Sequence, residues 1–335
     1  QVEVALMTEP LLKVQNLRVE LTTRNGTAPV IDDVSFELHA GENLSFVGES
    51  GCGKSMTALA IMGLLPEGIG RVTAGSIMFD GQELTALSQE RLRRIRGNDI
   101  SMIFQEPMTS LNPVYSIGEQ IVEVLLAHQS ISRTEAWAEA ANLLDAVRIP
   151  KARERLKDYP FQLSGGQRQR VMIAIALACK PKVLIADEPT TALDVTVQAQ
   201  IFDLLRDLRK ETGTSIILIT HDMGAVAEMA ERMIVMYAGR IAEIGAVDDI
   251  ISTPRHPYTK GLISCVPHVL AHVSDEKQPL TEVPGIVPSL REFGKDQCLF
   301  VSRCQHRTEE CLAARPKSVS FDGKQSADCW HAGAL

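Results

Sequence analysis

Aromatic side chains are scarce in this sequence of 335 residues: Phe, Trp and Tyr together make up 4%. No aromatic residue stands before Phe36. The longest apolar runs, such as Val171–Cys179, fall far short of the roughly 20 residues that a membrane-spanning helix needs. The first residues lack the charged-then-apolar pattern of a secretory signal. We therefore expect a soluble, cytosolic chain that reaches membranes only through partners.

Positive charge is not in excess either. The chain has 34 Lys and Arg against 42 Asp and Glu, a formal net charge of −8. This balance argues against a broad nucleic-acid-binding face, because phosphate backbones are bound mainly by basic residues. We interpret the local basic run at residues 91–96 as a solvated helix face. No nucleic acid is expected among the partners, and no internal repeat is detected.

Hydrophobic patterning indicates an α/β protein. Period-two alternation or short apolar runs predict strands, and helical spacing from residue 88 to about 160 predicts a helical insertion. Two helices are expected at 195–211 and from 223 onward, and their alternation with strands is typical of a mainly parallel sheet. The predicted strands are 12–20, 34–38, 43–47, 183–186 and 215–220.

The same patterning divides the chain into three parts. Residues 1–10 carry no recognisable pattern, and we expect them to be poorly ordered. Residues 11–250 hold the α/β core with its helical insertion. Prolines become frequent past residue 251, which predicts a small separate module at 251–335.

A glycine-rich turn follows the strand at 43–47 and precedes a helical stretch. Its sequence, G-E-S-G-C-G-K-S, fits G-x-x-x-x-G-K-[ST] in the context that gives this pattern meaning. Backbone N–H groups would cradle phosphates, the lysine would reach the terminal phosphates, and the last serine would bind Mg²⁺. The predicted nucleotide-binding residues are Gly48, Glu49, Ser50, Gly51, Cys52, Gly53, Lys54, Ser55 and Met56.

An acidic pair ends the strand at 183–186. Asp187 suits the magnesium shell, and the carboxylate of Glu188 can orient or deprotonate the water that attacks the γ-phosphate. We therefore expect ATP and Mg²⁺ as ligands, with Glu188 as the catalytic base.

A third element narrows the class of ATPase. The segment Leu163, Ser164, Gly165, Gly166, Gln167 opens a predicted helix, and such a helix start is an anion site. It resembles the signature of ATP-binding cassette ATPases. That resemblance implies a P-loop NTPase (RecA-like) core with a β-rich N-terminal subdomain and a helical insertion subdomain. It also implies that this signature caps the γ-phosphate bound by a second subunit.

Further roles follow from the resemblance alone. It implies that Gln105 binds nucleotide and Mg²⁺, that Asp194 contacts the partner in a dimer, and that His221 is a catalytic switch histidine. The family usually stacks adenine on an aromatic residue upstream of the phosphate loop, which this sequence lacks. Either Val30 or a side chain of a partner would take its place.

Three segments, 104–113, 186–194 and 255–259, are similar to the peptide-importer branch of the family. The resemblance implies a second cassette subunit and two permease subunits as partners, an indirect link to a substrate-binding protein, and a place on the cytoplasmic face of the inner membrane. ATP hydrolysis would drive uptake of di- or oligopeptides, with nickel, glutathione or an opine-like solute as alternatives. A soluble non-transport ATPase or an iron–sulfur-regulated ATPase are the alternative classes. We interpret His256 and Tyr258 as linker contacts.

Four cysteines crowd into the last forty residues, spaced C-x5-C-x6-C-x17-C. A cytosolic location disfavours disulfides, so the thiolates predict a metal site. Zinc normally takes paired C-x2-C motifs, and the matching tail of some peptide-importer ATPases carries a [4Fe-4S] cluster. We expect that cluster, with zinc or free thiols as alternatives, at Cys298, Cys304, Cys311 and Cys329.

Overall fold

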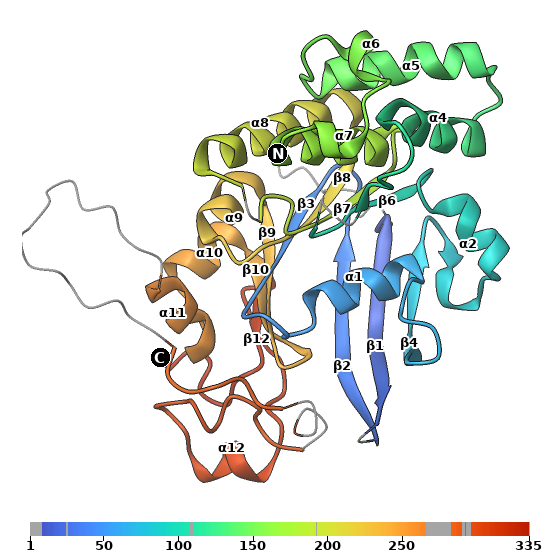
Figure 1. Ribbon diagram of the computed structural model, residues 1–335. Helices are drawn as coiled ribbons and strands as arrows, with labels where there is room; N and C mark the ends of the chain where they lie inside the picture. Colours follow the sequence, from blue (N-terminus) through green and yellow to red (C-terminus); the bar gives the residue numbers. More distant parts are fainter. Residues whose placement is uncertain are drawn as a thin grey trace, which may run out of the picture. The chain divides into compact units, whose positions relative to one another are not determined.

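The structure is a computed structural model that describes residues 9–24, 26–106, 110–191, 193–265, 283–289, 292 and 296–334. Residues 1–8 and part of the segment 104–113 lie outside this description, so the predictions for them are not addressed. The described chain forms two compact units, whose helices and strands are labelled in Figure 1. The first consists mainly of residues 79–219, and the second combines 13–37, 44–78 and the chain from 220 onward.

The first unit is built on three parallel strands, with β7 (Val183–Asp187) between β6 (Ile100–Ile103) and β8 (Ser215–Ile219). All three strands are buried along their whole length, as expected for strands covered on both faces. Strand β6 lies within the segment that the sequence predicted to be helical. Its four residues are too few to show a period of their own, and pairing with β7 decides their conformation.

The helices of the first unit begin with local signals that the sequence carries. Ser116 and Ser132 form capping boxes with Glu119 and Glu135, which satisfy the first free N–H groups of two helices. Gly213, in the left-handed conformation at φ 70°, ends the last helix. The elements are β5 (Gln82–Glu83), the 3₁₀ helices η1 (Leu84–Ala86) and η2 (Pro160–Gln162), α2 (Gln89–Ile95), α4 (Ile117–His128), α5 (Arg133–Ala146), α6 (Ala152–Arg155), α7 (Gly165–Leu177) and α8 (Val195–Thr212).

Two sheets form the second unit. One has the strand order β2 (Gly26–Leu38), β1 (Leu12–Thr23), β4 (Gly70–Phe79). The other has the order β11 (Val319–Phe321), β12 (Gln325–Ala327), β10 (Arg240–Ala246), β9 (Arg232–Tyr237), β3 (Asn43–Val47). Its helices are α1 (Lys54–Met62), α9 (Met223–Met229), α10 (Val247–Ser252), α11 (Pro257–Ser264) and α12 (Glu309–Ala313).

The C-terminal segment continues the second sheet. β12 pairs antiparallel with β10, with Glu243 opposite Ala327. The Glu243 side chain is fully buried and accepts hydrogen bonds from the N–H groups of Arg255 and His256 and from Gln325 Nε2. A buried carboxylate needs such donors, so this residue ties three separate stretches of chain together.

Aromatic side chains that are rare elsewhere gather in this unit. Tyr237, Tyr258 and Phe300 pack on one another, with ring centroids 4.6 to 5.5 Å apart. They belong to a core cluster that also includes Val47, the last residue of β3. This core therefore connects the strand before the phosphate loop with the C-terminal segment.

Candidate nucleotide-binding site

The phosphate loop (residues 48–55) leaves β3 through a backbone path that only glycine can follow. Gly48 has φ 145°, and a Cβ there would lie 2.3 Å from the carbonyl oxygen of Met236. Gly53 has φ 109°, and its Cβ would lie 2.6 Å from Ile31 Cδ1. Both glycines are required by their positive φ, and Gly48 also by its close approach to the Met236 backbone.

Lys54 lies near the end of this loop, as the first residue of α1 (Lys54–Met62), and is 6% exposed. Its ammonium donates hydrogen bonds to the carbonyl oxygens of Gly48, at 2.7 Å, and Glu49, at 3.1 Å. Cys52 is fully buried beside it, and burial raises the pKa of the Cys52 thiol although the charge of Lys54 lowers it. Burial thus favours the protonated thiol, which packs beside the ammonium of Lys54.

Ser55 and Met56 occupy the first turn of α1, which starts at Lys54. N–H groups in the first turn of a helix lack intrahelical partners and attract anions. His221 follows β8, and it lines one cavity together with Gly48 and Glu49. The structure thus brings the predicted switch histidine and the phosphate loop together within the second unit.

In the first unit, the structure brings Gln105 and Glu188 together. Gln105 Nε2 donates to Glu188 Oε2 at 3.0 Å, and Thr191 Oγ1 donates to the same oxygen at 2.8 Å. Glu188 has φ 45°, uncommon for a residue with a side chain, and its N–H donates to the carbonyl of Ile219. Asp187 is 4% exposed at the end of β7.

Thr191 was missed by sequence reasoning. Its only signal is its place three residues after Glu188, where the turn that follows β7 folds back on itself. The hydroxyl fixes one oxygen of the carboxylate, so Thr191 belongs with the residues that orient the predicted base.

The signature residues form an exposed helix start. Ser164 caps α7: its Oγ accepts from the N–H of Gln167 at 3.3 Å, and Gln167 Oε1 accepts from the N–H of Ser164 at 3.0 Å. Ser164 and Gly165 are exposed, whereas Leu163 is buried and anchors the turn. A Cβ on Gly166 would lie 2.9 Å from Val197 Cγ1. The segment therefore places the start of α7, where N–H groups lack intrahelical acceptors, on an exposed surface.

Asp194 is likewise exposed. Its Oδ1 accepts from the N–H of Val197 at 2.9 Å, so it caps α8. The adjacent Val195 is 82% exposed.

Val30 does not provide a surface for adenine. Only 4% of it is exposed, because its side chain packs inward from β2. The expectation that this aliphatic residue takes the place of the missing aromatic is therefore not supported.

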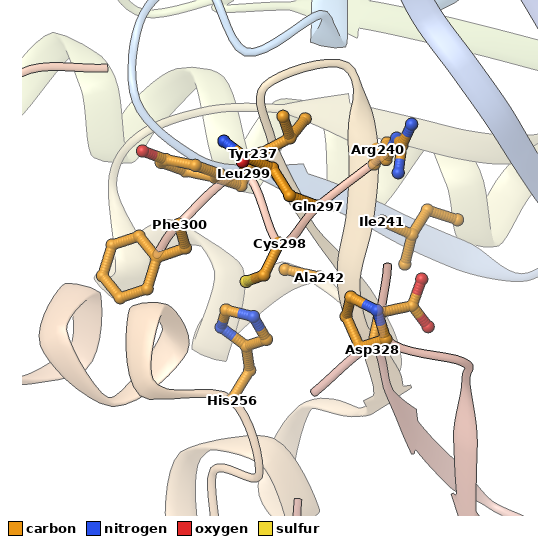
Figure 2. Close-up of a pocket in the computed structure, with 11 residues that line it drawn as sticks. Tyr237, Arg240, Ile241, Ala242, His256, Gln297, Cys298, Leu299, Phe300 and Asp328 are labelled. Carbon is orange, nitrogen blue, oxygen red and sulfur yellow. The ribbon is translucent and has the colours of Figure 1, made fainter. Parts of the chain in front are cut away.

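The structure brings the four C-terminal cysteines near one another. Burial, with a smaller contribution from the nearby Cys311, Cys329 and Cys304, raises the pKa of Cys298 to about 11. Figure 2 shows the Cys298 thiol and the His256 ring in the wall of one cavity. In the described part of the chain, however, no group of three or more His, Cys, Asp or Glu side chains is arranged to hold a metal ion. The metal prediction rests on the proximity of the thiols alone.

No helix among the described residues is both long enough and apolar enough to cross a membrane.

Comparisons with known proteins agree with this geometry. Residues 31–191 match the family described as ABC transporter, and residues 242–311 match the family described as oligopeptide/dipeptide transporter, C-terminal region. The dipeptide transport ATP-binding protein DppD of Bacillus subtilis is 49% identical, with 96% of this chain and 95% of that protein covered. The oligopeptide transport ATP-binding protein OppD of Escherichia coli is 50% identical, with 95% and 93% covered.

A solved structure supports the fold. The dimeric ATP-binding cassette MJ0796 in a post-hydrolysis state, bound to ADP and Pi, superimposes with a TM-score of 0.64 at 29% identity and covers 70% of this chain and 98% of its own. These matches agree with the phosphate loop, the acidic strand end and the signature segment. The chain therefore belongs to the ATP-binding cassette ATPases of ABC transporters, in the group that carries the oligopeptide/dipeptide transporter C-terminal region.

Proposed function

We propose that this chain binds MgATP, pairs with a second cassette and uses hydrolysis to drive uptake of di- or oligopeptides through two permease subunits. The observation that carries the proposal is that one chain has both a glycine-dependent loop around Lys54 and an exposed helix start at Ser164, and both are backbone arrangements that suit phosphate. The names of relatives about 50% identical over most of the chain support peptides as the cargo.

The proposed roles follow the chemistry of each side chain. Lys54 neutralises the terminal phosphates, and the first-turn N–H groups of α1 add hydrogen bonds. Ser55, Asp187 and Gln105 would hold Mg²⁺, which offsets charge on the phosphates when bound. Glu188, oriented by Gln105 and Thr191, accepts the proton of the attacking water. His221 and the partner's signature stabilise the charge of the transition state.

The proposed domain division places the cassette at residues 11–250 and a C-terminal module at 251–335. The separate matches at 31–191 and 242–311 support this division. The chain would then sit on the cytoplasmic face of the inner membrane through its permease partners, with only an indirect link to a substrate-binding protein.

The four-cysteine segment remains a proposed [4Fe-4S] site, with zinc or free thiols as alternatives. Four thiols close together fit soft metal ions. Iron and acid-labile sulfide, measured per chain after anaerobic purification, separate the three cases. A Cys311→Ser variant should lose both iron and sulfide.

The chain offers a matched pair of serines for testing the signature. Ser164 and Ser132 are both exposed helix N-caps with complete capping boxes, so replacing either by Arg removes an equivalent cap, worth about 1 kcal/mol. We expect Ser164→Arg to abolish ATP hydrolysis while leaving ATP binding intact, and Ser132→Arg to leave both intact. Full hydrolysis by Ser164→Arg would refute the two-site mechanism.

Cargo is tested by uptake. Cells whose own copy carries Glu188→Gln should lose uptake of labelled di- and tripeptides. If peptide uptake is retained and uptake of nickel, glutathione or an opine is lost, the solute whose uptake is lost would be supported as the cargo instead. Normal transport of all four, with ATPase activity lost, would support the soluble non-transport class.

A further inference from the structure

Glu49, the second residue of the phosphate loop, is held at three points. Its N–H donates to Tyr258 Oη at 2.8 Å, its carbonyl oxygen accepts from Lys54 Nζ at 3.1 Å, and its carboxylate takes two hydrogen bonds from Arg303, at 2.7 and 2.9 Å. Tyr258 and Arg303 both belong to the C-terminal segment. The phosphate loop is therefore gripped by residues more than two hundred positions away.

Arg303 is fixed on every side. Its side chain is 2% exposed, and besides Glu49 it donates to the carbonyl oxygens of Pro284 and Val283 and to Tyr237 Oη. These bonds account for all five N–H groups of the guanidinium. A bidentate pair with a carboxylate in such a setting has one geometry, so Arg303 dictates where the Glu49 side chain lies.

Tyr258 is equally constrained. It is fully buried in the first turn of α11 and packs against Tyr237, at 4.6 Å, and Phe300, at 5.5 Å, between ring centroids. Its hydroxyl fixes the Glu49 peptide from the other direction. Phe300 and Arg303 lie between Cys298 and Cys304 in sequence. One short stretch therefore carries two of the four cysteines and one of the two residues that contact Glu49.

The contacts that Arg303 and Tyr258 make with Glu49 also change the electrostatics of the phosphate loop. A carboxylate on a loop that binds polyphosphate repels its ligand, and the ion pair with Arg303 neutralises this charge. Lys54 donates to the Glu49 carbonyl, so the position of that peptide also sets the starting position of the lysine that must reach the phosphates.

We propose that Arg303 and Tyr258 are positioning residues for ATP: they hold Glu49 in place and neutralise it, so the C-terminal segment sets the affinity of the phosphate loop. The inference rests on the proposed binding of MgATP. It assigns to the C-terminal segment a task in the nucleotide cycle that is separate from cargo and from metal binding.

The experiment measures binding of a fluorescent ATP analogue with Mg²⁺, together with kcat and KM for ATP. Arg303→Met should raise the dissociation constant about 10- to 100-fold, because Glu49 is left as an unpaired charge. The double variant Glu49→Gln with Arg303→Met should regain most of that loss. Tyr258→Phe, which removes only the hydroxyl, should raise the dissociation constant about threefold to tenfold.

The kinetic signature separates positioning from general destabilisation. KM for ATP should rise in Arg303→Met while kcat at saturating ATP stays within about threefold, because the grip acts on binding and no reacting atom touches it. Arg303→Lys should fall between wild type and Arg303→Met, since one ammonium cannot reproduce the bidentate pair. Lys317→Met removes an exposed cation from the same segment and should change nothing.

Each outcome decides one question. Wild-type protein that fails to bind the analogue overturns the proposed function. Binding by wild type and equal binding by folded Arg303→Met overturns the positioning role, and a double variant as weak as the single one overturns the charge argument. If Arg303→Met does not fold, unchanged affinity in both Tyr258→Phe and Arg303→Lys overturns the proposal.

Discussion

Replacement of Glu188 by Gln is the sharpest test of the catalytic assignment. The substitution keeps the shape of the side chain and one oxygen that can accept from Gln105 and Thr191, now at 3.0 and 2.8 Å from Glu188 Oε2. It removes the negative charge and with it the ability to accept a proton from water. Only chemistry that depends on the carboxylate should change.

The magnitudes follow from these contacts. Hydrogen bonds to charged groups contribute about 1.5–3 kcal/mol and neutral ones about 0.5–1.5, so weakening two of them lowers the free energy of unfolding by about 1–3 kcal/mol. A positioned general base contributes about 10²–10⁴ in rate, so kcat should fall by at least about a hundredfold. ATP binding should be retained or strengthened, because the phosphate loop is unchanged and one negative charge is gone.

Steady-state ATP hydrolysis, binding of a fluorescent ATP analogue and thermal unfolding are the three measurements. Glu90→Gln is the matched control, since Glu90 lies in the same unit with a side chain 77% exposed, and it should behave as wild type. Undiminished hydrolysis by Glu188→Gln would refute the assignment of the base. Loss of hydrolysis together with loss of ATP binding would instead indicate that Glu188 has a structural role.

Three further predictions follow from the packing. Gly48→Ala should abolish ATP binding, because the added Cβ would lie 2.3 Å from the Met236 carbonyl oxygen. The control is Gly213→Ala, where no atom lies within 4 Å of the added Cβ; this variant should bind ATP normally in the same titration. Glu243→Leu should lower the free energy of unfolding by about 3–5 kcal/mol, measured by urea denaturation, because three donors lose their acceptor. Burial lowers the pKa of His256 to about 4 from 6.5, so its contribution to stability is full above pH 6.5 and is lost as pH falls toward 4. A His256→Asn variant should therefore show a flatter decline of the unfolding free energy between pH 6.5 and 4. An identical decline in the variant and the wild type would contradict this assignment.

Some elements were predictable because their causes are local. The contact of Lys54 with the Gly48 carbonyl, the Ser164 cap with its Gln167 partner, and the ending of α8 at Gly213 all depend on hydrogen bonds between residues a few positions apart. The strands predicted at 43–47 and 183–186 were found as β3 and β7. Short-range interactions of this kind can be predicted directly from the order of the residues.

Other features depended on pairings that no local pattern encodes. Strand β6 is a strand because β7 lies beside it, and β12 closes on β10 from the far end of the chain. Tyr258, which the sequence suggested was a linker contact, is instead the buried partner of the Glu49 N–H.

The order of the residues alone predicted two phosphate-binding elements and the family they indicate, and the comparisons show that family. The tertiary structure alone decided that Arg303 pairs with Glu49 across 254 positions. The physical reason is range: a cap or a glycine turn gains its free energy within one turn of chain, whereas a buried ion pair forms only after the sheet and the aromatic core have excluded water around it.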